Sequence, residues 1–230
     1  MNKLAKWFKK EYITGWNWFD YTFLFGLLTV QIVVSIILYD TTTSLGWNIF
    51  SIVSSFIGTL ATIICAKGKM SYYIWGFIQT VAFLILNLNM KLWVESAEQF
   101  YYLVTMIIGV FIWKKNINNT TAEIKGKKLD KKQMIFTILG LIVASVGIYF
   151  LDAFVLMGAQ PLLDTMSLSI AIVANILCSF CYKEQWFLWF VLDIIQTIMY
   201  FLVDNYILGI MYIGWTINCI YGWYNWGKEK

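Results

Sequence analysis

The sequence predicts an all-α integral membrane protein of about eight transmembrane helices, and three observations support this fold class. Of the 230 residues, 60% are hydrophobic and 13% are charged, whereas roughly a quarter of the residues in a soluble domain carry charge. Aromatic residues make up 19%, with 12 Trp, and Trp and Tyr collect at membrane interfaces and in ligand pockets. Finally, lysine-rich and lysine-poor connections alternate between the apolar stretches.

Eight stretches have the length and composition of a membrane-spanning helix, which needs roughly 20 mostly apolar residues. They lie at 21–39, 46–66, 71–89, 96–113, 133–151, 165–182, 185–203 and 206–226. The chain has one proline, Pro161, so little interrupts these helices. The longest connection, 114–132, is rich in lysine and has no apolar pattern, so we expect a single membrane domain.

Residues 1–20 precede the first stretch. They contain Lys3, Lys6, Lys9 and Lys10 but no small-residue cleavage site of the kind that ends a signal peptide. We expect a short amphipathic helix that lies on the cytoplasmic surface.

Lysines mark alternate ends of the predicted helices. Beyond the N-terminus they gather at Lys67 and Lys69, in 114–132, at Lys183, and at Lys228 and Lys230. The other connections hold Asp40, Lys91, Glu95, Glu98, Asp152, Asp164 and Asp204. The positive-inside rule then places both termini in the cytoplasm of a multi-pass protein of the cell membrane. Because topology accounts for the lysines, the formal charge of +4 does not indicate nucleic acid as a partner.

Weak sequence matches indicate an internal repeat. Trp75 and Gln79 match Trp189 and Asp193, 114 residues later, and Lys69 matches Lys183. At an offset one shorter, the matches are Gly109 with Gly222, Trp113 with Trp226, and Thr105 with Asn218. The offset covers an even number of helices, so the copies cross the bilayer in the same direction, as in SWEET-type and major-facilitator carriers.

The repeat divides the single membrane transport domain, residues 1–230, into consecutive parts. We expect an amphipathic N-terminus at 1–20, a first repeat at 46–113, a cytoplasmic loop at 114–132, a linker helix at 133–151 and a second repeat at 165–226.

The composition argues against catalysis and metal binding. The chain has no His, and all 17 basic residues are Lys, so the commonest general base and the commonest metal ligand are missing. The four cysteines lie in apolar segments, and Cys178-x-x-Cys181 has no second pair, which favours helix packing. We expect no cofactor, no metal and no enzyme activity. A membrane enzyme, and a sensory or assembly protein without transport, are the alternatives from other classes.

Buried polar side chains are the candidate functional residues, because an Asp in the middle of a membrane helix costs about 2.5–3.5 kcal/mol. One stripe lies on the seventh predicted helix at spacings of 3 and 4, on one helical face: Trp186, Trp189, Asp193, Gln196 and Tyr200. The eighth helix carries Asn218, Tyr221 and Asn225, the sixth Asn175, and the third Gln79. Hydrogen bonds that only join helices are the alternative interpretation.

Other polar and aromatic residues are interpreted by their place near helix ends. We expect Asn87, Asn89, Glu95 and Glu98 to be solvated or in a vestibule, and an interfacial belt is the alternative for Trp223 and Trp226. The candidate set suits a flat aromatic ligand with a sugar or an amine. Indole rings stack on it, a cationic ring adds about 0.5–2 kcal/mol, and Asn and Gln bind amides or hydroxyls. The rings of carbonyls or charges that an ion channel needs are not visible.

Two motifs resemble the PnuC family of vitamin-precursor transporters, with a likeness that extends over roughly residues 20–227. They are Trp186-Phe-Leu-Trp189 and Asn218-x-x-Tyr221-Gly222-Trp223-Tyr-Asn-Trp226. The resemblance implies a SWEET-like 3+1+3 core of two parallel three-helix repeats, plus an N-terminal helix. It also implies facilitated diffusion of nicotinamide riboside, with trapping by intracellular phosphorylation.

The resemblance further implies roles for individual residues. Trp186 and Trp189 would stack on the nicotinamide ring, and Asn218 and Tyr221 would contact the amide or ribose. Gln79, Asn175, Asp193 and Gln196 join the binding site by polarity and position. Relatives that take thiamine, riboflavin or deoxynucleosides leave these substrates as alternatives. The expected partners are the substrate, the lipid bilayer, a homo-oligomer and, functionally, a cytoplasmic kinase.

Overall fold

The computed structural model describes residues 2–37, 39, 41, 44–89, 93–151, 154, 161–202 and 206–228. Within these residues the chain forms α-helices and two isolated β-bridges, without a named strand, which confirms the predicted all-helical class. The helices are α1 (Lys3–Tyr12), α2 (Trp18–Ile37), α3 (Leu45–Lys67), α4 (Tyr72–Asn89), α5 (Trp93–Lys115), α6 (Lys131–Leu151), α7 (Pro161–Ser179), α8 (Gln185–Leu202) and α9 (Tyr206–Gly227).

Some of the residues named from the sequence lie outside the part of the chain that the structure describes. Asp40, Lys91, Asp152, Asp204 and Lys230 lie outside the described residues, and so do the side chains of Glu95, Asp164 and Tyr200. Several helices begin before the predicted apolar stretches, as α2 does at Trp18 and α7 at Pro161, because a helix continues into the polar region beyond the apolar span.

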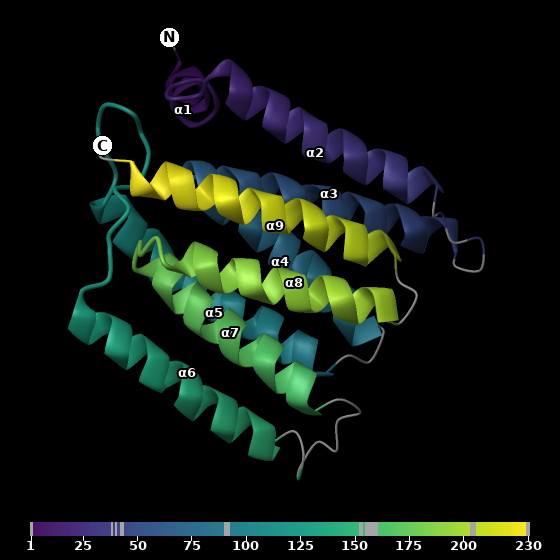
Figure 1. The fold of residues 1–230 in the computed structure, drawn as a ribbon. Coiled ribbons are helices and arrows are strands. Elements are labelled where there is room, and N and C mark those ends of the chain that lie inside the picture. The colour runs from purple at the N-terminus through teal and green to yellow at the C-terminus, as the bar shows by residue number, and fades with distance from the viewer. Residues whose placement is uncertain are drawn as a thin grey trace.

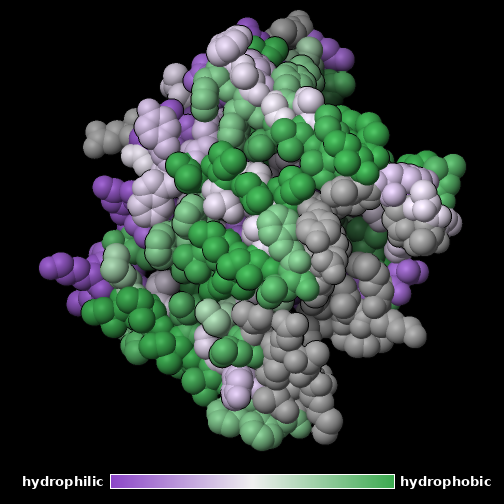
Figure 2. All heavy atoms as spheres, turned by 45° about the vertical axis from the view of Figure 1, so that its right-hand side comes forward, coloured by the Kyte–Doolittle hydropathy of each residue, from purple (hydrophilic) through white to green (hydrophobic). Residues whose placement is uncertain are grey.

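Four described helical segments are long and apolar enough to cross a membrane: Trp18–Ile37, Leu45–Lys67, Ser96–Lys115 and Lys131–Leu151. Helices α2 to α9 run side by side, while α1 is seen end-on beside the start of α2, and both termini lie at one end of the bundle (Figure 1). Figure 2 shows apolar side chains over most of one face and hydrophilic ones gathered mainly along one edge. A lipid-facing surface has this distribution, since only the ends meet water.

The packing divides the bundle into two groups of three helices. Helix α4 packs between α3 and α5, and α8 packs between α7 and α9. The groups meet where α3 contacts α9 and where α5 contacts α7. Helix α2 lies against both α3 and α9, whereas α6 packs on α7 alone among the described helices.

Contacts in the first group recur in the second between residues 113 positions apart. The Cys65 and Cys178 sulfurs, which have that separation, lie 3.9 Å apart. The Trp113 indole donates to the Cys178 carbonyl at 2.9 Å, and the Trp226 indole donates to the Cys65 carbonyl at 3.0 Å. Each indole reaches across to the other group, so the two contacts are exchanged as by a two-fold axis near the cysteines.

The turns that follow two of the helices, and two close contacts between helices, also recur 113 residues apart. Helices α3 and α7 are each followed by a left-handed residue, Gly68 with φ 73° and Cys181 with φ 66°. A Cβ on Gly109 would collide with Tyr73, and a Cβ on Gly222 would collide with Trp186.

This packing corrects one alignment made from the sequence. Helices α4 and α8 correspond at 113 residues rather than at the 114 inferred from Trp75 and Trp189. Asp193 therefore corresponds to Thr80, and each is 3% exposed. The alignment at 114 residues relied on two identical tryptophans, Trp75 and Trp189. The register of packed helices is instead fixed by close contacts, here those at Gly109 and Gly222.

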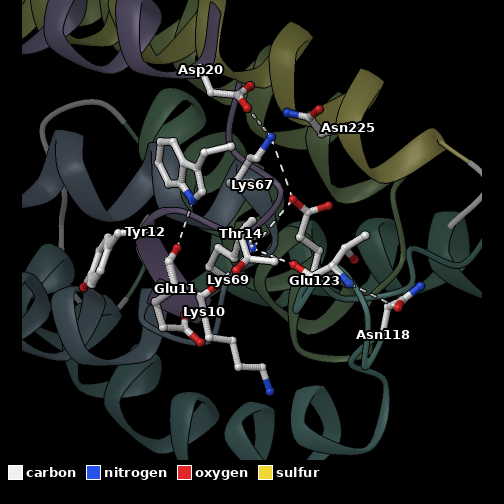
Figure 3. Close-up of polar contacts among 12 residues, drawn as sticks. Lys10, Glu11, Tyr12, Thr14, Asp20, Lys67, Lys69, Asn118, Glu123 and Asn225 are labelled. Carbon is white, nitrogen blue, oxygen red and sulfur yellow. Dashed lines mark hydrogen bonds and ion pairs between the residues drawn. The ribbon is translucent and has the colours of Figure 1, made fainter. Parts of the chain in front are cut away.

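A buried ionic network lies at the end of the bundle that holds the termini (Figure 3). Asp20 of α2 pairs with Lys67 at the end of α3. Glu123, from the 114–132 connection, lies 3.8 Å from both the Lys67 and the Lys69 amines. The Lys69 amine also donates to the carbonyl of Thr121 at 2.8 Å.

The network changes the interpretation of two lysines. Lys67 is 4% exposed and Lys69 is fully buried, so these residues join segments of the chain as well as marking a membrane end. Helix α1 is anchored beside them, because the Ser71 backbone N–H donates to the Glu11 carboxylate at 2.8 Å. On the rest of α1, Leu4, Trp7 and Phe8 are exposed on one face, as expected for an amphipathic helix.

Candidate functional site

A cavity lies where the two groups of helices meet. Its volume is about 160 Å³, roughly ten times the ~15 Å³ that one water molecule requires. Helices α3, α4, α5, α7, α8 and α9 all contribute to its wall. The lining residues are Thr62, Cys65, Tyr72, Gln79, Thr80, Phe83, Glu98, Gln99, Tyr102, Met106, Asn175, Cys178, Trp186, Trp189, Leu192, Asp193, Gln196, Tyr212, Trp215, Asn218 and Cys219.

The predicted stripe on α8 forms one side of this cavity. Trp186, Trp189, Asp193 and Gln196 all line it, because spacings of 3 and 4 keep them on one face of the helix. Asn218 of α9, Asn175 of α7 and Gln79 of α4, which were also predicted, line other walls. The fold thus brings together residues that the sequence singled out on four separate helices. Their role in binding stays a prediction.

Three buried polar atoms among the lining residues lack a hydrogen-bond partner within the described structure. They are the Asn175 Oδ1, the Asn218 Oδ1 and the Trp186 Nε1. The Asn218 amide nitrogen donates to the Thr62 carbonyl at 3.1 Å, which fixes the orientation of that side chain. An unsatisfied buried polar group costs about 1–3 kcal/mol, so these two acceptors and one donor favour a polar ligand or water in the cavity.

Two carboxylates line the cavity from different groups of helices. Asp193 on α8 is 3% exposed, and one of its oxygens accepts a hydrogen bond from the Cys219 thiol at 3.3 Å. Glu98 on α5 accepts a hydrogen bond from the Tyr102 hydroxyl. Glu98, which was expected to be solvated or in a vestibule, thus lines the cavity from the early turns of α5.

Aromatic rings surround the polar groups. Trp189 lies with its ring centroid 6.4 Å from that of Tyr102, at an interplanar angle of 64°, and its indole nitrogen donates to Gln185 at 3.2 Å. On α9, Trp215 donates to the Thr59 hydroxyl at 3.4 Å. Hydrogen bonds at their nitrogens hold these two indoles in place beside the cavity.

Trp186 is held differently from Trp189. It is 4% exposed, and its ring packs on Gly222 and lies edge-on to Trp226, with centroids 5.6 Å apart. Trp186 is therefore a tightly packed indole in the cavity wall. Trp226 is itself 1% exposed, which excludes the interfacial-belt interpretation for that residue. Trp223 is 39% exposed, beneath the Lys183 amine at 4.4 Å.

Tyr221 is the one predicted binding residue that does not line the cavity. Its hydroxyl donates to Asp20 in the ionic network, and its ring lies 4.8 Å from that of Phe23. Tyr221 lies about one helical turn beyond Asn218, at a level of α9 where Asp20 and Phe23 of α2 are its neighbours. The expectation of a substrate contact at Tyr221 is corrected by this geometry.

Glu98, Gln99, Tyr102, Tyr212 and Trp215 line the cavity but were not in the predicted binding set. A signal was present on α5, where Glu98 and Tyr102 are four residues apart and share a face. The same periodicity on α9 links Tyr212 and Trp215 to Asn218.

Known proteins share this architecture and somewhat under a third of this sequence. A family model described as "Nicotinamide mononucleotide transporter" matches residues 48–228. A relative from Neisseria mucosa, named nicotinamide riboside transporter PnuC, is 29% identical over 96% of this chain and 86% of its own length. The protein of the same name from Haemophilus influenzae is 29% identical over 98% and 96%. The crystal structure of a vitamin B3 transporter PnuC matches with a TM-score of 0.82 and 28% identity, over 98% of this chain and 97% of that one.

Proposed function

The chain belongs to the nicotinamide mononucleotide transporter family, and on this premise we propose that it carries nicotinamide riboside across the cell membrane. Relatives that cover nearly the whole chain are named as transporters of this riboside. Its family and its apolar helices make it a multi-pass membrane protein, and membership of a transporter family favours transport over catalysis.

The observation that supports this substrate is the composition of the cavity. An amide and a ribose offer both donors and acceptors, which match the unpartnered oxygens of Asn175 and Asn218 and the indole N–H of Trp186. Trp189 supplies an aromatic surface beside them. The lining residues include two carboxylates and no lysine, so a cationic pyridinium ring suits the cavity better than the phosphate of a mononucleotide.

For the architecture we propose the SWEET-like 3+1+3 arrangement. Helices α3–α5 and α7–α9 would be parallel repeats, within 46–113 and 165–226, α6 the linker, and α2 an added helix. Eight crossings would place both termini and the 114–132 connection in the cytoplasm, with 1–20 on the membrane surface. The exchanged contacts of Trp113 and Trp226 support this proposal, since parallel repeats related by an axis along the membrane normal produce such pairs.

The mechanism we propose is facilitated diffusion by rocking of the two repeats around the cavity. Cys65 and Cys178 line the cavity, and the buried indoles of Trp226 and Trp113 donate to their carbonyls. A cytoplasmic kinase would then trap the riboside by phosphorylation. A homo-oligomer stays a prediction.

Uptake of labelled nicotinamide riboside into proteoliposomes tests the proposal. Facilitated diffusion predicts saturable uptake that follows the substrate gradient and ignores an imposed pH or sodium gradient. Concentrative uptake driven by either ion would overturn the diffusion mechanism, and an absence of any uptake above that of empty liposomes would overturn the carrier.

Thiamine is the rival substrate that a specific observation favours, because the two carboxylates serve any cationic ring. A thermal-shift panel of nicotinamide riboside, thiamine, riboflavin and deoxynucleosides separates the candidates. The proposal requires the largest shift with nicotinamide riboside, and a larger shift with thiamine would reassign the substrate.

A further inference from the structure

The two carboxylates of the cavity differ in their surroundings. Asp193 is 3% exposed and is bonded to the Cys219 thiol on the neighbouring helix. Glu98 is half-buried, four residues before Tyr102 on the same face of α5. Of the two lining carboxylates, Glu98 is thus the more accessible.

Glu98 is tied to the aromatic wall through one residue. The Tyr102 hydroxyl donates to a Glu98 oxygen, and the Tyr102 ring meets the Trp189 ring edge-to-face, with centroids 6.4 Å apart. Carboxylate, phenol and indole therefore form a continuous unit that joins α5 to α8. A ring that stacks on Trp189 would share the cavity with this negative charge.

The charge of such a ring then determines how well it binds. A cation near a half-buried carboxylate gains much more than it would in water, because the effective dielectric constant falls near and inside a protein. The indole face adds a further attraction for a cation. A neutral ring of the same shape has the same stacking area but neither electrostatic gain.

We propose that Glu98, oriented by the Tyr102 hydroxyl beside Trp189, selects substrates whose aromatic ring carries a positive charge. This inference deepens the proposed function and rests on it. Glu98 contacts the substrate, whereas Tyr102 is a positioning residue.

Binding of two matched ligands to the full-length protein in detergent tests the selection. Nicotinamide riboside carries a cationic pyridinium, and its 1,4-dihydro form has nearly the same shape without the charge. For Glu98→Gln, calorimetry should give a loss of affinity for the cation on the order of tenfold or more, with the affinity for the neutral form within about twofold of the wild type. Tyr102→Phe should lower the preference for the cation by a smaller factor, because it frees the carboxylate without removing it.

Glu184→Gln is the matched control, since Glu184 lies in the connection between α7 and α8 and does not line the cavity. It should leave the ratio of the two affinities unchanged. Equal losses for both ligands in Glu98→Gln, or an unchanged ratio, would refute charge selection while the carrier itself stands. If the wild-type protein bound neither ligand, the proposed substrate would fall instead, and the two failures are thus distinguishable.

Discussion

Trp189 shows how a single side chain contributes to the cavity. Its ring borders the cavity and Tyr102, while its nitrogen is occupied by Gln185. Trp189→Ala should therefore remove the stacking surface without removing an anchor of the fold. We expect binding of nicotinamide riboside to weaken by about 1–3 kcal/mol, the usual worth of a stacked base, with little change in melting temperature.

Calorimetry on the purified variant measures this effect. Trp18→Ala is the control, because Trp18 is 80% exposed at the start of α2 and far from the lining residues. Unchanged affinity in Trp189→Ala would remove this indole from the site.

Asp20 is a second residue whose substitution should have a defined effect, here on stability. It pairs with Lys67 and accepts from Tyr221, and it is 2% exposed. Asp20→Asn keeps the shape but leaves a buried ammonium without its nearest counter-charge, and breaking a buried pair costs about 3–5 kcal/mol. We expect a clearly lower melting temperature in detergent, with the affinity for substrate retained at low temperature.

Asp130→Asn provides the comparison. Asp130 caps the start of α6 by accepting from the Gln133 N–H at 2.8 Å, and Asn caps a helix about as well as Asp. This variant should melt like the wild type. Equal melting temperatures for the two variants would show that the Asp20 pair contributes nothing to stability.

The residues that sequence alone located, and those it missed, have a common explanation. Trp186, Trp189, Asp193 and Gln196 were found because the helical period relates residues within one element. Tyr221 was misassigned because its partner, Asp20, is 201 residues away. Glu98 was left out of the predicted binding set because a charge near a helix end is usually solvated, and only the packing of α5 shows that it lines the cavity.

At the scale of the helix, the similarity of the turns after α3 and α7 could not be predicted from the sequence either. Gly68 and Cys181 both adopt the left-handed conformation, but only glycine does so without strain, so the cysteine gave no signal. The Lys127 N–H donates to the Cys181 carbonyl at 2.8 Å, and the Ile124 N–H donates to the Gly68 carbonyl at 2.9 Å. The 114–132 connection thus secures both turns.

Gly68→Ala tests the turn after α3. The new Cβ would lie 2.8 Å from the Ile124 side chain, at a φ of 73°, so strain and crowding should lower stability by about 1–3 kcal/mol. Gly140→Ala, in the exposed middle of α6 with nothing near its added Cβ, should be neutral or raise stability by up to about 1 kcal/mol. Melting curves of both variants compare the two sites, and a Gly68→Ala protein as stable as Gly140→Ala would contradict the role of the turn.

At the scale of the whole molecule, the two groups of helices are joined by hydrogen bonds beside the cavity. Cys65 and Cys178 line the cavity, and their carbonyls accept the bonds of Trp226 and Trp113. Because each bond joins one group to the other, rocking of the groups at this end must break both.

A covalent link between Cys65 and Cys178 should therefore stop transport. Their sulfurs are 3.9 Å apart, and a disulfide needs about 2.05 Å, a shift within reach of small side-chain rotations. Diamide would take up the two electrons and two protons that the thiols release. Uptake of nicotinamide riboside into proteoliposomes should then fall to the level of empty liposomes and recover with dithiothreitol, while Cys65→Ser protein should be insensitive to the oxidant. If mass spectrometry confirmed the link and uptake continued at the full rate, the two groups would not separate at this point, and the path of the substrate would have to lie elsewhere.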